Sequence, residues 1–356
     1  RIMLKIELLQ PPRSNQQSGG YLFNENITKL LKEKGICKLV EVKKENLIEY
    51  ISEASFKRVV IVLDSIYLQF IDFSEIKPLL REENLKIILL LHLLPSSDLD
   101  KESFDNQILK KLNSRELVWI KQSNLVIIVT GSNYKKELLK HRVCSSRVKV
   151  VNPGQESYPF KTIKVGESKK IHYPIKGISV GTISPRKNQI LLVDMLSKIN
   201  PKLYRWTFIG NKQLFPEYTK KVMNMANKGN WKASLFFVGQ VHHSKVLMSL
   251  TDSDLFVSTS VKESYGMSVA EACSVGLPVL SFNTGDFSSW VKHNQNGYLI
   301  DQDDIRGMQN KLNDVISDLS ILTGLKDVAK KNSSGIHFPT WEESSTKLEK
   351  ICRTIY

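Results

Sequence analysis

Two glutamates eight residues apart, Glu263 and Glu271, frame the part of the sequence best suited to chemistry. The apolar run 254–259 before them is typical of a buried strand, and residues 268–275 are predicted to form a short helix. A turn from a parallel strand into a helix brings unpaired N–H groups to the ligand-binding edge of an open α/β sheet, where they favour a phosphate. Because glycine has no Cβ, Gly266 would let such an anion approach the backbone closely.

The same residues also permit a purely structural interpretation. Ser268 and Glu271 have the spacing of a capping box, in which both side chains satisfy N–H groups at a helix start. Glu263 would then be a solvated loop acid. Local chemistry alone leaves both interpretations open.

A second group of charged residues follows the first strand of the second half of the chain. Arg186 and Lys187 lie in the loop 181–188, directly after the predicted strand 177–181. Two adjacent cations usually face solvent, but at a strand end they would offer a phosphate two charge-assisted hydrogen bonds. The pair His242-His243 is predicted to be a surface pair rather than a metal site, since no carboxylate or cysteine lies at ligand spacing.

These residues need a scaffold, and strands and helices alternate along the whole chain. This alternation predicts parallel sheets with helices on both faces. The chain of 356 residues is long enough for two such domains. Neither half has a Gly-rich dinucleotide fingerprint or a P-loop, which argues against a nicotinamide dehydrogenase or a P-loop enzyme. Strands are predicted at 2–9, 38–42, 58–63, 86–91, 125–130 and 147–151, then at 177–181, 205–209, 234–238, 255–258 and 278–282.

The segment E-S-Y-G-M-S-V-A-E-A-C-S-V-G-L-P-V, residues 263–279, resembles the E-x7-E signature of retaining glycosyltransferases of family 4. This family has the GT-B fold, in which two doubly wound Rossmann-like domains face a central cleft. The resemblance implies an acceptor-side domain over 1–170 and a nucleotide-sugar-binding domain over 171–340. A helix over 341–356 would cross back to the first domain. Independently of the resemblance, the weak periodicity, the glycine and the lysines of 161–168 are typical of an interdomain linker.

The resemblance also implies roles for individual residues. Glu263 would hold the transferred sugar, Glu271 the ribose, and Lys187 with Arg186 the leaving diphosphate. One departure is Thr182, since the family commonly has arginine there, and Arg186 could substitute for it. The expected catalytic residues are Glu263, Lys187, Arg186 and His92; the expected donor-binding residues are Glu271, Gly266, Met267, Ser268, Tyr265, Thr182, Gly19 and Gly20.

The function implied is retaining transfer of a hexose-type sugar from a UDP- or GDP-sugar, without a metal or other cofactor. The acceptor would be a glycan, a lipid-linked saccharide or a protein. Two alternatives remain open: a GT-B sugar-nucleotide epimerase or hydrolase, and a non-catalytic nucleotide-sugar-binding subunit of a glycosyltransferase complex.

The amino-acid composition limits which partners and which cellular location are expected. The formal charge of +15 fits an anionic membrane surface or a lysine-rich soluble protein, while the lack of any nucleic-acid motif places nucleic acid last. No apolar stretch is long enough to span a membrane, and no secretion leader is evident. We therefore expect a cytoplasmic protein, either free or peripheral at the membrane face. Scattered cysteines, Cys37, Cys144, Cys273 and Cys352, fit a reducing compartment.

Overall fold

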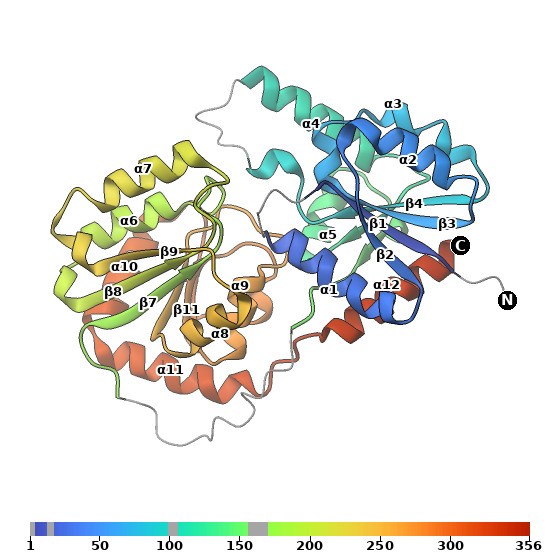
Figure 1. The fold of residues 1–356 in the computed structure, drawn as a ribbon. Coiled ribbons are helices and arrows are strands. Elements are labelled where there is room, and N and C mark those ends of the chain that lie inside the picture. The colour runs from blue at the N-terminus through green and yellow to red at the C-terminus, as the bar shows by residue number, and fades with distance from the viewer. Residues whose placement is uncertain (1–3, 13–17, 99–105, 156–169) are drawn as a thin grey trace. The chain divides into compact units, whose positions relative to one another are not determined.

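The computed structural model describes residues 4–12, 18–98, 106–155 and 170–356, which form two compact units (Figure 1). The first unit comprises Arg1–Glu156 with Pro339–Tyr356, and the second comprises Ser157–Phe338. The boundary predicted from the sequence is residue 170, and the predicted linker 161–168 lies outside the described residues.

The first unit is built on a six-stranded parallel sheet in the order β2-β1-β3-β4-β5-β6. The central strands are continuous apolar runs, as expected when helices cover both faces of a parallel sheet. All of these strands were predicted, with ends that differ by a few residues. Their bounds are β1 Ile6–Gln10, β2 Cys37–Glu41, β3 Val59–Asp64, β4 Leu85–Leu91, β5 Val126–Val129 and β6 Val148–Val150.

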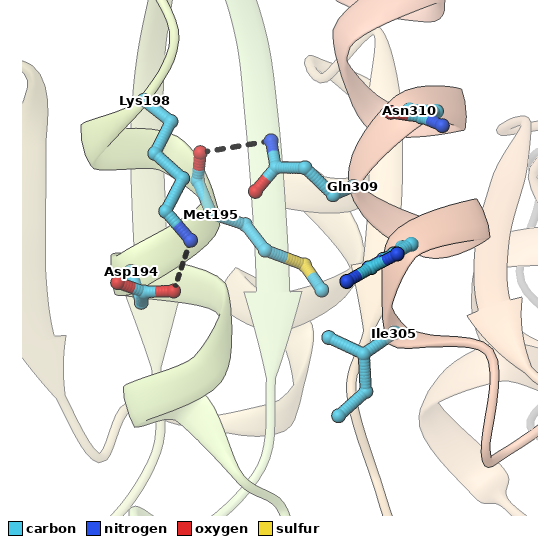
Figure 2. Close-up of a pocket in the computed structure, with 7 residues that line it drawn as sticks. Asp194, Met195, Lys198, Ile305, Gln309 and Asn310 are labelled. Atoms are coloured by element: carbon cyan, nitrogen blue, oxygen red, sulfur yellow. Dashed lines mark hydrogen bonds and ion pairs between the residues drawn. The ribbon is translucent and has the colours of Figure 1, made fainter.

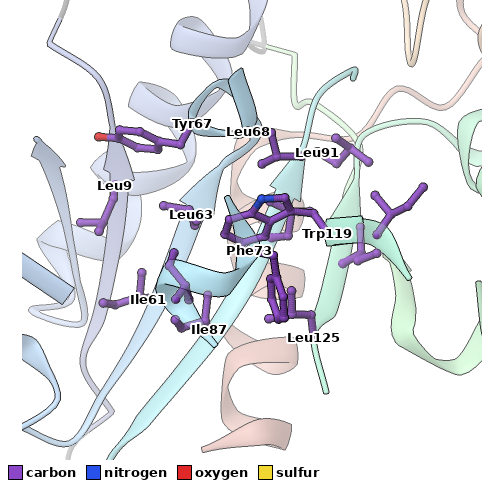
Figure 3. Close-up of a cluster of buried hydrophobic side chains, with 14 of the residues drawn as sticks. Leu9, Ile61, Leu63, Tyr67, Leu68, Phe73, Ile87, Leu91, Trp119 and Leu125 are labelled. Carbon is purple, nitrogen blue, oxygen red and sulfur yellow. The ribbon is translucent and has the colours of Figure 1, made fainter. Parts of the chain in front are cut away.

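Two apolar clusters lie on opposite faces of this sheet. On one face, Trp119 of α4 packs edge-on against Phe73 of α3 at 5.2 Å, beside Leu63 and Leu125 (Figure 3). The other face is covered by α1 and by the carboxyl-terminal helix α12. The helices are α1 Gly19–Glu33, α2 Leu47–Ala54, α3 Phe73–Ile76, α4 Asn106–Ile120, α5 Ser132–Lys140 and α12 Trp341–Ile355.

Helix α12 starts with a capping box between Thr340 and Glu343. Its buried residues Leu348 and Cys352 join the apolar cluster that includes α1. A Cβ at Gly154 would lie 2.3 Å from the backbone nitrogen of Trp341, so only glycine lets the two backbones approach here. The last helix is therefore part of the first unit.

The second unit has a six-stranded parallel sheet in the order β12-β11-β10-β7-β8-β9. Helices α8 and α9 contribute to one apolar cluster, and α6, α7, α10 and α11 to another. The strands are β7 Ile175–Val180, β8 Tyr204–Ile209, β9 Leu235–Gly239, β10 Leu255–Ser258, β11 Val279–Phe282 and β12 Gly297–Ile300. The helices are α6 Gln189–Ser197, α7 Pro216–Ala226, α8 His243–Thr251, α9 Met267–Ser274, α10 Ile305–Ser317 and α11 Leu319–Ser333.

Candidate active site

The segment between β10 and α9 carries the two candidate glutamates. Gly266 is the N-cap of α9 and adopts a left-handed backbone with φ +91°. A Cβ at this position would lie 2.1 Å from Cε1 of Phe287. The structure therefore gives a conformational and a packing reason for this glycine, where the sequence analysis gave only close approach of an anion.

The capping-box interpretation of Ser268 and Glu271 is wrong. The N-cap is Gly266, which provides no side-chain hydrogen bond, and Glu271 is buried inside the helix. By helix geometry, the first N–H groups of α9, at Met267 and Ser268, have no partner within the helix. They remain suited to an anion, and Glu271 is available for another role.

Glu263 lies between two cations. Its Oε1 is 2.5 Å from Nζ of Lys187 and its Oε2 is 3.1 Å from Nη1 of Arg186. The Glu263 side chain is 8% exposed and each cation is 16% exposed. Burial raises the pKa of Glu263, but Lys187 and then Arg186 outweigh it, and the net effect lowers this pKa to about 2. Glu263 is therefore not a solvated loop acid but the centre of a buried charge cluster.

Backbone and side-chain contacts fix the two loops that carry this cluster. The Val261 N–H donates to the carbonyl of Arg186 at 2.8 Å. The hydroxyl of Thr259 contacts the carbonyls of Lys187 and Asn188 at 3.1 and 2.8 Å. Because the loops are joined by these bonds, the charged side chains start from a fixed backbone.

Thr182 occupies the position where the family resemblance implies an arginine. Its carbonyl accepts a hydrogen bond from Nε2 of Gln189 at 2.9 Å. The neighbouring Gly181 packs against the Lys187 stem, since a Cβ there would lie 3.0 Å from Cε. Although position 182 is threonine, Arg186 supplies a guanidinium to the cluster at Glu263.

Glu271 contacts a histidine that the sequence analysis did not select. Nε2 of His243, the first residue of α8, lies 2.8 Å from Oε1 of Glu271. The neighbouring His242 is exposed and caps α8 by accepting from the Ser244 N–H. His242 lies at the surface as predicted, whereas His243 is half-buried and contacts Glu271, which was not predicted. No sequence signal links residues 243 and 271, which only the packing of α8 against α9 brings together.

Tyr265 lies in the same segment and is buried. Its ring packs edge-on against Trp290 at 4.6 Å. Its hydroxyl is buried without a hydrogen-bond partner among the described residues. Burial, then Asp286 and Glu271, raise the pKa of this hydroxyl, so it stays protonated and can donate a hydrogen bond.

The remaining candidates lie in the first unit. Gly19 and Gly20 are the first residues of α1, whose N-cap is Ser18. A Cβ at Gly20 would lie 3.1 Å from Cδ2 of His92, so the glycine lets α1 start against this ring. Burial lowers the pKa of His92, although the Asp64 carboxylate raises it in part. The structure therefore shows that Gly20 and His92 are neighbours, which could not be predicted from the sequence.

A shallow pocket of about 210 Å³ lies between α6 and α10 (Figure 2). Met195 and Gln309 line it, and the nearby Lys198 is paired with Asp194 at 2.7 Å. None of the candidate residues lines this pocket, so we assign it no part in the chemistry. Across the described ranges, no cluster of three metal-ligating side chains is found. No helix in the described part of the chain has the length and apolar character required to span a membrane.

Residues 161–334, which cover nearly all of the second unit, match the family described as glycosyl transferases group 1. This match and the two parallel-sheet units support a glycosyltransferase of the GT-B fold.

Particular relatives agree with this class. The chain is 25% identical over 174 residues to the sulfoquinovosyl transferase SQD2 of Arabidopsis thaliana, a match that spans 48% of this chain and 32% of that protein. Its fold resembles HepE of Anabaena in complex with UDP-glucose, with a TM-score of 0.72, 16% identity, and coverage of 98% and 100% of the two chains. It also resembles sucrose-phosphate synthase of Thermosynechococcus elongatus, with a TM-score of 0.74, 15% identity and 99% coverage of both.

Proposed function

We propose that this protein is a retaining glycosyltransferase that moves a hexose-type sugar from a UDP- or GDP-sugar to a hydroxyl of its acceptor, without a metal. The observation that carries the proposal is the Lys187–Glu263–Arg186 cluster beside the start of α9. Two partly buried cations held by one carboxylate are suited to exchange part of their contact for a diphosphate. The likeness to HepE, which binds UDP-glucose, supports a nucleotide-sugar donor.

Charge on the leaving diphosphate would be stabilised by Lys187, Arg186 and the N–H groups of Met267 and Ser268. The backbone that carries Lys187 and Arg186 is held in place before the donor binds, because it is hydrogen-bonded to Thr259 and Val261. Such preorganised donors lower the barrier without reorganising during the reaction.

Glu263 would act by charge rather than by proton transfer. A carboxyl with a pKa of about 2 is a poor base at neutral pH, since an effective general base has a pKa near the working pH. It would hold hydroxyls of the transferred sugar and stabilise positive character at the anomeric carbon. Both its oxygens are occupied by cations, which disfavours a role as nucleophile and supports retention by front-face attack.

Glu271 would accept hydrogen bonds from the ribose hydroxyls, and His243 would hold its carboxylate in place. Oε1 of Glu271 contacts His243 at 2.8 Å, which leaves the lone pairs of Oε2 for a ligand. The buried hydroxyl of Tyr265 is a further donor that a bound nucleotide sugar would satisfy.

The proposed acceptor is a glycan, a lipid-linked saccharide or a protein, reached in the cytoplasm or at an anionic membrane face. The charge of +15 supports an acidic or membrane-associated acceptor. In the first unit we propose Gly19 and Gly20 as donor-binding residues and His92 as a catalytic residue.

A thermal-shift screen against UDP, GDP and ADP sugars tests donor binding, because a ligand that binds only the folded state raises the unfolding temperature. Products formed from the donor that binds separate the alternatives. A glycosylated acceptor supports the proposal. Consumption of the sugar nucleotide without any glycosylated product would favour an epimerase or hydrolase. Tight binding without turnover would favour a non-catalytic subunit.

A further inference from the structure

Four polar side chains form a buried network in the first unit. They come from the carboxyl ends of the neighbouring strands β1 and β3, the residue after β4, and helix α1. Gln10 and Asn24 are fully buried, and Asp64 is nearly so. The fourth member, His92, lies 3.0 Å from Asn24 through Nε2 and Oδ1. A buried polar group destabilises the folded state unless each donor faces an acceptor. The contacts in this network therefore determine which atoms carry protons.

The orientation of the Asn24 amide follows from its neighbours. The Gln10 amide nitrogen donates to Oε1 of Glu41 at 3.3 Å, so Gln10 Oε1 faces Asn24 at 3.0 Å. Oδ2 of Asp64, a carboxylate oxygen, lies 2.6 Å from the same Asn24 atom. Two acceptors therefore face one end of the amide, and that end must be the NH₂ group.

The other end of the Asn24 amide then determines which nitrogen of His92 carries a proton. Since Oδ1 of Asn24 can only accept, Nε2 of His92 must carry a proton and donate it. Oδ2 of Asp64 lies 3.6 Å from the same nitrogen and favours a proton there. Burial of His92 lowers its pKa, so the ring holds a single proton at neutral pH and Nδ1 keeps a lone pair.

We propose that Gln10, Asn24 and Asp64 lock His92 in the neutral Nε2–H tautomer, so that Nδ1 is a fixed hydrogen-bond acceptor for a substrate hydroxyl. Asn24 is thus a positioning residue. The Cδ2–Nε2 edge of the ring faces Gly20 and Asn24, and the opposite edge bears Nδ1. The side chain keeps 19% of its surface exposed. A nitrogen that can only accept hydrogen bonds binds a sugar hydroxyl and repels a phosphate or carboxylate oxygen. The substrate group that contacts Nδ1 is therefore a hydroxyl.

The substrate part of this inference rests on the proposed glycosyl transfer, but the tautomer does not. Protein labelled with ¹⁵N-histidine is recorded by long-range ¹H–¹⁵N correlation at neutral pH, and the His92 signals are identified by their loss in His92→Phe. The expected spectrum has a protonated Nε2 and an unprotonated Nδ1. A protonated Nδ1, or exchange between both tautomers, in the wild-type protein would overturn the proposal.

Asn24→Leu removes the acceptor and is expected to give a mixture of tautomers. Thr28→Val is the matched control, because Thr28 is buried on the same helix and its hydroxyl bonds only to backbone carbonyls of α1. If Asn24→Leu does not fold, Asp64→Asn frees the Asn24 amide to rotate and should move the proton toward Nδ1. An unchanged His92 spectrum in the folded variant would contradict the lock.

Kinetics test the role in binding. Asn24→Leu should raise the KM of the sugar-bearing substrate in proportion to the loss of the Nε2–H tautomer, about twofold for an even mixture, with little change in kcat. Thr28→Val should leave both constants unchanged. Unchanged KM in Asn24→Leu would refute the positioning role, whereas a wild-type protein that transfers no sugar would refute the proposed function and leave the tautomer result standing.

Discussion

Glu263→Gln removes the negative charge between Lys187 and Arg186 and keeps the size of the side chain. Both cations then remain 16% exposed without their carboxylate. Breaking a buried ion pair by removing one partner costs about 3–5 kcal/mol, and partial exposure places this case near the lower end. The pKa of Glu263 gives a free energy of the same size, because a fall from 4.5 to about 2 corresponds to roughly 3 kcal/mol.

The sign of the pH dependence follows from the direction of this shift. The folded-state pKa of Glu263 is lowered, so its stabilisation is fully present above the ordinary value of 4.5 and is lost as pH falls to about 2. Wild type and Glu263→Gln should therefore differ by a constant free energy of unfolding near neutral pH. This difference should shrink as the solution is acidified through that range.

Calorimetry with and without UDP makes the test specific. Glu263→Gln should lower the unfolding temperature of the second unit by roughly 6–12 °C, given 2–4 °C per kcal/mol for a unit of this size. UDP should then stabilise the variant more than the wild type, because no carboxylate competes for the two cations. Transfer activity should fall even so, since the sugar loses its partner.

A matched control lies in the same unit. Asp254 and Lys326 form a similar pair at 2.5 Å, with side chains 15% and 12% exposed. Asp254→Asn should lower the unfolding temperature comparably and leave the response to UDP unchanged. A Glu263→Gln protein as stable as the wild type, or one that UDP stabilises less, would refute the reasoning.

Three further outcomes are expected. Lys187→Ala should lower kcat/KM for the correct donor on the order of 10²–10³-fold, as for one preorganised charge donor, and an unchanged value would remove Lys187 from the mechanism. Glu271→Ala should weaken UDP and UDP-sugar binding alike, and His243→Ala should weaken both to a lesser degree; titration calorimetry that shows wild-type affinity in Glu271→Ala would contradict the ribose assignment. Co-sedimentation should show binding to anionic but not neutral vesicles, lost above about 0.15 M salt because screening shortens the reach of surface charges; equal, negligible binding to both vesicles would leave the charge as a feature of composition.

Much of the fold could be predicted because strand periodicity is local. The buried strands of both sheets are apolar runs bounded by turn residues, which a sequence displays directly. Strand β12 was missed because it is a short edge strand that begins with Gly297 and has a half-buried centre. Helix α11 was missed because Gly324 and several Ser and Thr residues weaken its helical pattern.

The candidate site was predicted only in part, for a similar physical reason. Glu263, Lys187 and Arg186 could be selected because charged residues at strand ends are visible in the sequence. Their mutual contact could not, since 76 residues separate Glu263 from Lys187 and only the sheet order brings β7 beside β10.

The histidine contacts of Glu271 and Asn24 depend on how helices pack, which no local pattern encodes. Gly266 could be selected from the sequence, but the packing reason for it could not. The aromatic ring that excludes a Cβ at this position belongs to residue 287.

The anomeric configuration of the first product tests the central proposal most directly. The protein is incubated with an α-linked sugar nucleotide selected by thermal shift and with a saccharide acceptor, and the anomeric configuration of the glycoside formed is read by ¹H NMR. We expect an α-configured product, formed by the wild type and strongly reduced in Lys187→Ala. A β-configured first product would contradict retention, and a panel of UDP, GDP and ADP sugars that are neither bound nor consumed would contradict glycosyl transfer itself.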